Sequence, residues 1–314
     1  MKIIVLAFKY NDIFYAQATP EFKNSSEKIL IKFVTENFID SPFPGEDLFT
    51  KIINIKVKSH NKYHLIGIIN DINKLFRKNK FIGEYILVLS NIELIITRFI
   101  AKKNIIKSII LLEDGLMNYY YPIRPSTGLK RIIEFLLSIN FNTIKKNISG
   151  TYLNNPELAL YYFGKKLRFS HTNFRCNNFL VKKIVNKKLF IGGGYFENFN
   201  IITKVKIIKY LIEFENIDYF IPHHFDTFDW SSLIEIIDLR NEKITLEMIF
   251  DKISFIKIYG FGTSVQLNAI FRELPSEIVF IECNANNVQN VAFDYIKEKS
   301  KKIINIDNLI SNAN

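Results

Sequence analysis

Short runs of apolar residues recur along the chain, with longer amphipathic stretches between several of them. The runs have the length of β-strands, are rich in Ile, Val and Phe, and are apolar on both faces. This composition is typical of strands in a parallel sheet that is covered on two sides. The predicted strands are residues 2–8, 63–70, 85–90, 108–114, 188–194, 219–224, 254–260 and 277–284.

Three amphipathic stretches predict helices. Residues 26–39, 129–140 and 202–214 space their apolar positions three and four apart, which places them on one face of an α-helix. Alternation of strands and helices predicts a doubly wound α/β architecture.

The alternation is interrupted between about residues 140 and 188, where Asn, aromatic residues and Lys dominate. This break predicts two Rossmann-like domains facing a cleft, an N-terminal domain over residues 1–184 and a C-terminal domain over residues 185–314. Ligands of such sheets bind beyond the carboxyl ends of the strands. The residues that follow each predicted strand are therefore the first candidates for a site.

Charge narrows the choice of partner. The 314 residues have a formal charge of +11, which suits nucleic acid, a phospholipid surface or an anionic small molecule, although a solvated Lys-rich surface is the simpler explanation. Lys strongly outnumbers Arg, and no long basic block occurs, which disfavours nucleic acid.

Cysteine usage and the N-terminus bear on the compartment. Cys176 and Cys283 form no CxxC pair, so neither a disulfide framework nor a zinc site is indicated. The apolar run at the N-terminus is too short for a signal peptide. We expect a cytoplasmic protein, with peripheral contact to the inner face of the cell membrane through its lysines as an extension of that expectation.

The first candidate motif is Glu113-Asp114-Gly115, which follows the strand predicted over 108–114. Adjacent carboxylates repel, and one can raise the proton affinity of its neighbour, as a general base requires. Glycine permits close approach of substrate or backbone. The structural alternative is an acidic pair at the start of a helix, where it faces the positive end of the dipole.

Two further motifs follow strands of the C-terminal half. Gly192-Gly193-Gly194 forms a turn whose N–H groups can bind a phosphate, although a tight turn without a ligand is equally plausible, and it lacks the Lys and Ser/Thr of an NTPase loop. Pro222-His223-His224 ends the strand predicted over 219–224, and a histidine there can donate a hydrogen bond or a proton to a leaving phosphate. A structural hydrogen bond is the alternative role. Further ligands at metal-binding spacing are missing from this motif.

The fourth candidate is Gly260-Phe261-Gly262-Thr263-Ser264, which leads from a strand into a helix. The hydroxyls of Thr263 and Ser264 can cap that helix or bind a phosphate. The glycines also resemble half of a dinucleotide fingerprint, but Val265 stands where the third glycine belongs, which disfavours an NAD-dependent oxidoreductase. No DxD pair of a metal-dependent sugar transferase and no GxSxG elbow occurs.

The order of these motifs resembles that of bacterial GT-B sialyltransferases, including lipooligosaccharide sialyltransferases and capsular polysialyltransferases. That group has a D/E-D/E-G motif, then an HP motif, then a Ser/Thr pair, similar here to 113–115, 221–224 and 263–264 over about 150 residues. This chain departs from the pattern because His224 replaces the proline of the HP motif, while Pro222 precedes the histidine.

The resemblance implies a GT-B fold and an inverting, metal-independent transfer of sialic acid from CMP-sialic acid to a hydroxyl of a lipooligosaccharide or capsular glycan. Asp114 would be the general base, Glu113 would hold it or raise its pKa, and His223 would donate to the phosphate of CMP. The residues implied in donor binding are Gly115, Gly193, Gly194, His224, Thr263 and Ser264. The expected partners are a CMP-sugar, a glycan acceptor that is lipid-linked in one version, and an anionic membrane, with no cofactor and no nucleic acid.

Two alternatives from the sequence stay open. A GT-B glycosyltransferase with another nucleotide sugar would share the fold and the glycine turns. A non-catalytic nucleic-acid-binding protein is favoured by net charge alone and predicts salt-sensitive binding of DNA or RNA.

Overall fold

The computed structural model describes residues 1–34, 42–57, 64–78, 81–115, 117–120, 127–169, 185–223, 226–239, 244–250, 253–283 and 291–308. The chain divides into two compact units, Met1–Cys176 and Asn177–Asn314. The boundary predicted after residue 184 lies in a segment outside the described residues, so its position stays a prediction.

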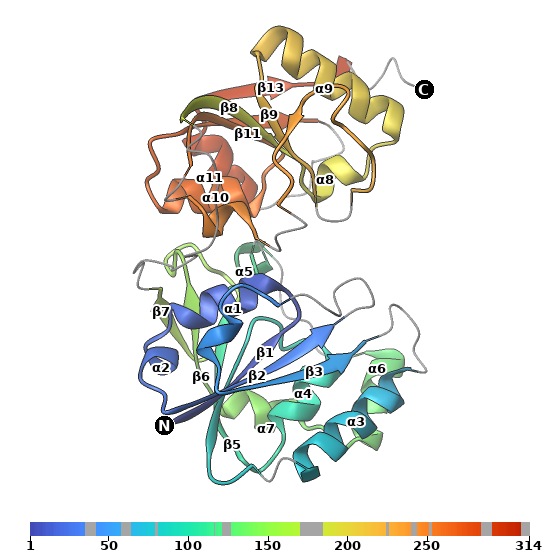
Figure 1. The fold of residues 1–314 in the computed structure, drawn as a ribbon, viewed down its shortest axis with the longest axis vertical. Helices are drawn as coiled ribbons and strands as arrows, with labels where there is room; N and C mark the ends of the chain where they lie inside the picture. Colours follow the sequence, from blue (N-terminus) through green and yellow to red (C-terminus); the bar gives the residue numbers. More distant parts are fainter. Residues whose placement is uncertain are drawn as a thin grey trace. The chain divides into compact units, whose positions relative to one another are not determined.

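The first unit is built on a seven-stranded sheet in the order β3-β2-β1-β4-β5-β6-β7, and every neighbouring pair is parallel (Figure 1). Its strands are β1 (Lys2–Ala7), β2 (Glu27–Val34), β3 (Lys51–Lys56), β4 (Tyr85–Leu89), β5 (Ile106–Leu112), β6 (Ile148–Leu153) and β7 (Lys165–Arg168). Its helices are α1 (Tyr10–Gln17), α2 (Pro20–Lys23), the 3-10 helix η2 (Glu46–Leu48), α3 (His64–Lys78), α4 (Ile95–Ala101), α5 (Met117–Tyr120), α6 (Gly128–Leu136) and α7 (Phe141–Lys146).

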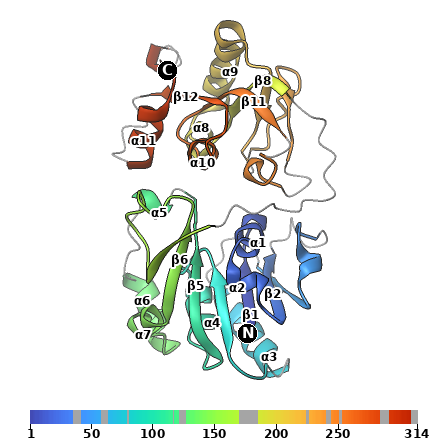
Figure 2. The ribbon, with the colours of Figure 1, turned by 90° about the vertical axis from the view of Figure 1, so that its left-hand side faces the viewer.

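The second unit has a six-stranded sheet in the order β10-β9-β8-β11-β12-β13, again parallel throughout (Figures 1 and 2). Its strands are β8 (Val185–Ile191), β9 (Tyr219–Ile221), β10 (Glu235–Ile236), β11 (Ser254–Gly260), β12 (Glu277–Glu282) and β13 (Lys302–Asn305). Its helices are α8 (Gly194–Glu197), α9 (Ile201–Glu215), the 3-10 helix η3 (Leu246–Met248), α10 (Ser264–Phe271) and α11 (Val291–Lys299).

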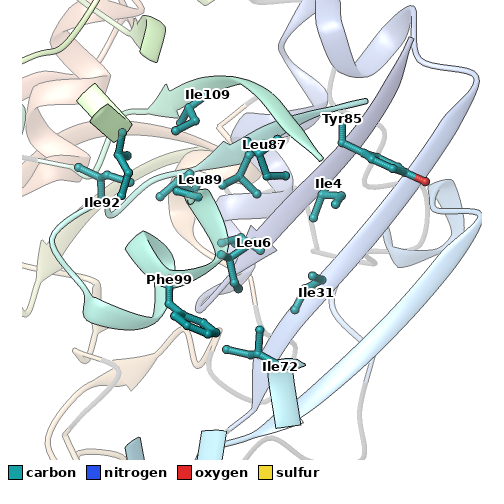
Figure 3. Packing of buried hydrophobic residues seen from close by; sticks show 14 of the residues in the cluster. Ile4, Leu6, Ile31, Ile72, Tyr85, Leu87, Leu89, Ile92, Phe99 and Ile109 are labelled. Carbon is teal, nitrogen blue, oxygen red and sulfur yellow. The ribbon is translucent and has the colours of Figure 1, made fainter. Parts of the chain in front are cut away.

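The core of the first unit forms where alternate strand residues meet helices. Leu6, Leu87 and Leu89 point from the sheet toward Ile72 of α3 and Phe99 of α4 (Figure 3). These side chains are almost fully buried. Removal of such apolar surface from water is the main favourable contribution to folding.

Two predicted elements are of the wrong type. Residues 26–39, predicted as a helix, contain β2, which lies between β1 and β3 and is buried on both faces from Ile29 to Val34. Apolar residues occupy every position from 29 to 34 except Lys32, so this run matches helical spacing as well as the continuous pattern of a buried strand. Residues 63–70, predicted as a strand, contain the first turns of α3, whose apolar residues continue at helical spacing to Phe76.

A buried ion pair fixes α6 to α4. Arg98 of α4 is fully buried, and its Nη1 lies 2.6 Å from Oε1 of Glu134 in α6. Arg98 also donates Nε–H to the carbonyl of Ile92 at 2.9 Å, and its guanidinium lies 3.9 Å from the centroid of the Phe141 ring. Loss of one member of such a pair leaves an uncompensated buried charge.

We therefore expect Arg98→Met to lower the free energy of unfolding by about 3–5 kcal/mol. The double variant Arg98→Met/Glu134→Met should recover much of that loss, because neither charge then remains buried alone. Urea unfolding followed by circular dichroism measures both. Lys107→Met is the control, since its ion pair with Glu84 is exposed and should change stability by less than about 1 kcal/mol. Equal losses for Arg98→Met and Lys107→Met would contradict the expectation.

Candidate functional site

The predicted motifs lie at the carboxyl ends of strands, close to the point in each sheet where the strand order reverses. In the first unit the reversal falls between β1 and β4, and in the second between β8 and β11. Ligands of open α/β sheets bind at such switch points, because the connections leave the sheet edge in opposite directions there.

Asp114 follows β5, the strand beside β4. Its Oδ1 lies 2.5 Å from Nζ of Lys9, and its Oδ2 accepts a hydrogen bond from Nδ2 of Asn91 at 3.2 Å. Its backbone N–H donates to Oδ1 of Asn118 at 2.8 Å. The side chain is 19% exposed, so the carboxylate is held by fixed donors and is still accessible. Gly115, the next residue, has a φ of +57°, a conformation that favours glycine.

The residues that hold Asp114 come from the ends of neighbouring strands. Lys9 follows β1, and Asn91 follows β4. Asp12, in the first turn of α1, accepts hydrogen bonds from the N–H groups of Phe8 and Lys9 at 2.8 and 3.0 Å and so fixes the backbone of Lys9. Burial raises the pKa of Asp12, the charge of Asp114 adds to the rise, and Lys9 opposes it.

None of these supporting residues was among the sequence candidates. Lys9 and Asp12 stand directly after the predicted strand 2–8, so inspection of that strand end could have identified them. Their contact with Asp114, more than one hundred residues away in the sequence, depends on strand order and has no signal in the sequence.

Glu113 points away from this accessible cluster into the core. It is 1% exposed and accepts hydrogen bonds from the Tyr119 hydroxyl at 2.5 Å, from the N–H of Asn154 at 2.7 Å and from Nδ2 of Asn154 at 2.8 Å. Burial and the charge of Glu113 raise the pKa of Tyr119, so its phenol stays protonated and donates. These contacts favour a positioning role for Glu113, which ties the end of β5 to the end of β6.

In the second unit, the glycine turn after β8 contacts the other two predicted motifs. A Cβ atom at Gly193 would lie 2.7 Å from Cγ2 of Thr263, and one at Gly192 would lie 3.1 Å from the backbone nitrogen of His223. A Cβ atom at Gly194 would meet open space. The turn is therefore glycine-rich because two neighbouring chain segments press against it, and its third glycine opens α8.

His223 follows β9 and is half-buried. Burial lowers its pKa, the charge of Lys204 on α9 acts in the same direction, and Asp226 opposes them. The imidazole is therefore neutral near pH 7 and can donate one N–H. The backbone N–H of Asp226 donates to the carbonyl of His223 at 2.9 Å, which fixes the turn. His224, predicted in donor binding, lies outside the described residues.

Lys204 is a further residue that the sequence did not identify, since it lies within an amphipathic helix. Its Nζ is paired with Oε2 of Glu197 at 2.6 Å, and both side chains are largely buried. It supplies a positive charge close to the turns.

Thr263 and Ser264 have different roles at the start of α10. The Thr263 hydroxyl accepts a hydrogen bond from the N–H of Gln266 at 3.2 Å and so caps the helix, as predicted. Ser264 is already inside the helix, and its hydroxyl donates to Oε1 of Glu247 at 3.2 Å, so its predicted capping role is wrong. Oε1 of Gln266 accepts from the N–H groups of Gly262 and Thr263 at 3.0 and 3.1 Å, which occupies two backbone donors that a phosphate could otherwise use.

Aromatic rings support these turns from below. Phe190 of β8 stacks on Phe220 of β9 with centroids 5.2 Å apart, and Phe196, Trp230 and Phe261 pack around this pair. The Phe220 ring lies 3.1 Å from the position of a Cβ atom at Gly192. The packed rings hold the ends of β8, β9 and β11 at fixed spacing.

The described residues contain no group of three or more His, Cys, Asp or Glu side chains that could hold a metal ion.

No protein-family model and no curated protein matches the chain.

Solved structures share the fold of the whole chain. The UDP-GlcNAc 2-epimerase of Methanocaldococcus jannaschii, in complex with UDP-GlcNAc and UDP, is similar with a TM-score of 0.54 and 14% identity over 100% of this chain and 91% of that one. A Listeria monocytogenes protein described as a UDP-N-acetylglucosamine 2-epimerase is similar with a TM-score of 0.53 and 10% identity over 99% and 86%. Together with the two parallel sheets, these likenesses confirm the predicted α/β fold with two Rossmann-like domains, the GT-B fold of glycosyltransferases and related sugar-nucleotide enzymes.

The two neighbouring carboxylates should respond differently to neutralisation. Glu113→Gln replaces a buried acceptor of three hydrogen bonds by an amide with a single acceptor oxygen, so we expect a loss of about 1–3 kcal/mol in the free energy of unfolding. Asp114→Asn removes a partly exposed ion pair and should cost less than about 1 kcal/mol. Urea unfolding measures both, and a larger loss for Asp114→Asn would show that the assignment of core and site carboxylates is reversed.

Proposed function

We propose that the protein is an inverting, metal-independent sialyltransferase that moves sialic acid from CMP-sialic acid to a hydroxyl of a bacterial surface glycan. The observation that supports it best is the meeting of three motifs in the second unit, where Gly193 contacts Thr263 and Gly192 contacts the backbone of His223. These are the glycine turn and the histidine and hydroxyl motifs, and the last two are motifs of the sequence resemblance. A group transfer from a nucleotide sugar needs a phosphate site of this kind.

The second unit binds the donor in this proposal. His223, neutral near pH 7, donates a hydrogen bond to the phosphate of CMP. The Thr263 hydroxyl uses an acceptor lone pair to cap α10, so its hydrogen can still be donated to a phosphate oxygen. Ser264 would first have to give up its bond to Glu247, which makes Thr263 the principal hydroxyl donor. Lys204 adds positive charge nearby, as a departing monophosphate requires.

The first unit supplies the base in this proposal. Asp114 takes the proton from the acceptor hydroxyl. As it does so, the hydroxyl oxygen of the acceptor forms a bond to the anomeric carbon of sialic acid, and the bond from that carbon to the phosphate oxygen of CMP breaks. CMP leaves with the electron pair of the broken bond. Lys9 and Asn91 fix the two oxygens of Asp114, so the base is oriented before the acceptor arrives. Glu113 positions the strand end and takes no part in proton transfer.

Nucleotide binding tests the donor site. CMP at about one hundred times its dissociation constant should stabilise the wild-type protein by about 2.7 kcal/mol, seen as a rise in Tm. We expect His223→Ala and Thr263→Val to lose this rise, and Thr263→Ser to keep it because the hydroxyl is retained. UDP is the comparison ligand, since a protein of the same fold binds UDP.

The results separate the hypotheses. A rise in Tm with UDP and none with CMP would contradict the choice of donor and would favour another nucleotide-sugar transferase. No rise with either nucleotide would contradict both a CMP-sugar and a UDP-sugar as the donor. Tm values without nucleotide show whether a variant is folded.

Loss of the base should abolish transfer without affecting the donor site. We expect Asp114→Asn to lower the rate of sialyl transfer from CMP-sialic acid, measured across a panel of mono- and disaccharide acceptors, by roughly 10²–10⁴-fold. Its rise in Tm with CMP should equal that of the wild type. Asp47→Asn, an exposed carboxylate of the same unit, is the matched control and should keep full activity. Wild-type transfer rates in Asp114→Asn would exclude Asp114 as the base.

A further inference from the structure

Helix α6 presents an apolar face to solvent. Leu129, Ile132, Phe135 and Leu136 are 54%, 57%, 82% and 73% exposed. Their spacing of three, three and one places all four on one side of the helix. Single exposed apolar residues are ordinary, but a contiguous group of this kind on a short helix indicates a surface that contacts something else.

The orientation of α6 is the reverse of that expected for an amphipathic surface helix. The charged residue Glu134 faces inward and pairs with Arg98, and Lys130 is half-buried near the same pair, with its pKa lowered by burial and by the charge of Arg98. Rotation of the helix to bury its apolar side chains would break the Arg98–Glu134 pair. The buried ion pair therefore keeps the apolar face outward.

Exposed basic residues lie close to this face along the chain. Residues 127–146, which span α6 and α7, contain four basic side chains and one acidic one, and the acidic one is Glu134, neutralised by Arg98. Arg131 on α6 and Lys145 and Lys146 on α7 are exposed. An open pocket of about 900 Å³ adjoins the end of α6 at Ser138, and Lys102 and Lys103 are among its lining residues.

We propose that α6 is an interfacial anchor, which inserts Leu129, Ile132, Phe135 and Leu136 into the surface of an anionic phospholipid bilayer while the surrounding basic side chains contact lipid headgroups. Helices with one apolar face and a basic border lie in the plane of the interface in this way. Each basic residue near an anionic leaflet adds to the attraction. Helix α6 has nine residues, fewer than the roughly 20 that a spanning helix needs, so it would lie on the surface. Among the described residues, none of the helices could span a membrane.

Charge favours a bilayer over a second copy of the chain. A symmetric contact through α6 would bring together two surfaces that both carry exposed basic residues, Arg131 with Lys145 and Lys146 of the following helix, and like charges at a contact oppose association. An anionic lipid surface is complementary to both the apolar face and its basic border. The proposal is independent of the donor and of the reaction proposed above.

Flotation with vesicles tests the anchor, using the full-length protein with phosphatidylcholine vesicles that contain or lack 30% phosphatidylglycerol. We expect the wild type to float with the anionic vesicles, and Ile132→Gln/Phe135→Gln to lower the partition coefficient by roughly tenfold or more. Arg131→Gln/Lys145→Gln should lower it by roughly an order of magnitude on anionic vesicles only. The matched control is Ile202→Gln/Phe214→Gln, which removes similarly exposed apolar side chains from α9 and should stay within about twofold of wild type.

Three outcomes would overturn the anchor. The first is a wild-type protein that does not float, and the second is an Ile132→Gln/Phe135→Gln variant that floats like the wild type. The third is a wild-type protein that light scattering shows to be a dimer without lipid while the variant is a monomer, which would assign the apolar face to a second copy of the chain. An unchanged rise in Tm with CMP in the variant would show that the donor site is unaffected, so failure of the anchor and failure of the transferase proposal are distinguishable.

Discussion

The candidate donor site depends on one steric constraint, the contact between the turn after β8 and the start of α10. With a Cβ atom at Gly193 only 2.7 Å from Thr263, any side chain at this position would push the two turns apart. The turn that precedes α10 is equally restricted. Its Gly262 has a φ of +82°, and a Cβ atom at this position would lie 2.6 Å from the Phe293 ring. Both glycine turns are thus shaped by packing, and the proposed phosphate site would be a consequence of that packing.

The two units place their candidate groups at the same part of the sheet but use different side chains. Each places functional groups at the ends of adjacent parallel strands beside the reversal of strand order. The second unit uses glycine, a neutral histidine and a hydroxyl, which suit a phosphate. The first unit uses a carboxylate whose two oxygens are held by Lys9 and Asn91, which follow β1 and β4, and this suits proton transfer from a fixed position.

The sequence predicted the class of fold and seven of the thirteen strands that the structure describes, because parallel strands buried on both faces are continuous apolar runs. It failed where that composition also imitates a helix, as in β2, and where an apolar helix start imitates a strand, as in α3. It did not predict β3, β6, β7, β10 and β13, which are short or interrupted by polar residues. Residues that follow a strand were predictable as candidates, and Thr263 caps its helix as expected. The partners of Asp114 were not, because contacts between Lys9, Asn91 and Asp114 require the order of β1, β4 and β5.

Helix α6 shows a further limit of structure prediction from the spacing of apolar residues. The spacing of apolar residues over 129–140 correctly indicated a helix with an apolar face, and the usual assumption is that such a face packs on the sheet. The direction of the face is decided by Arg98, a residue of another helix that is fully buried and requires a carboxylate partner. Burial of Glu134 satisfies that requirement and leaves the apolar side chains outward. A charge inside the core thus determines which chemistry the surface displays, and the pattern of α6 alone does not contain that information.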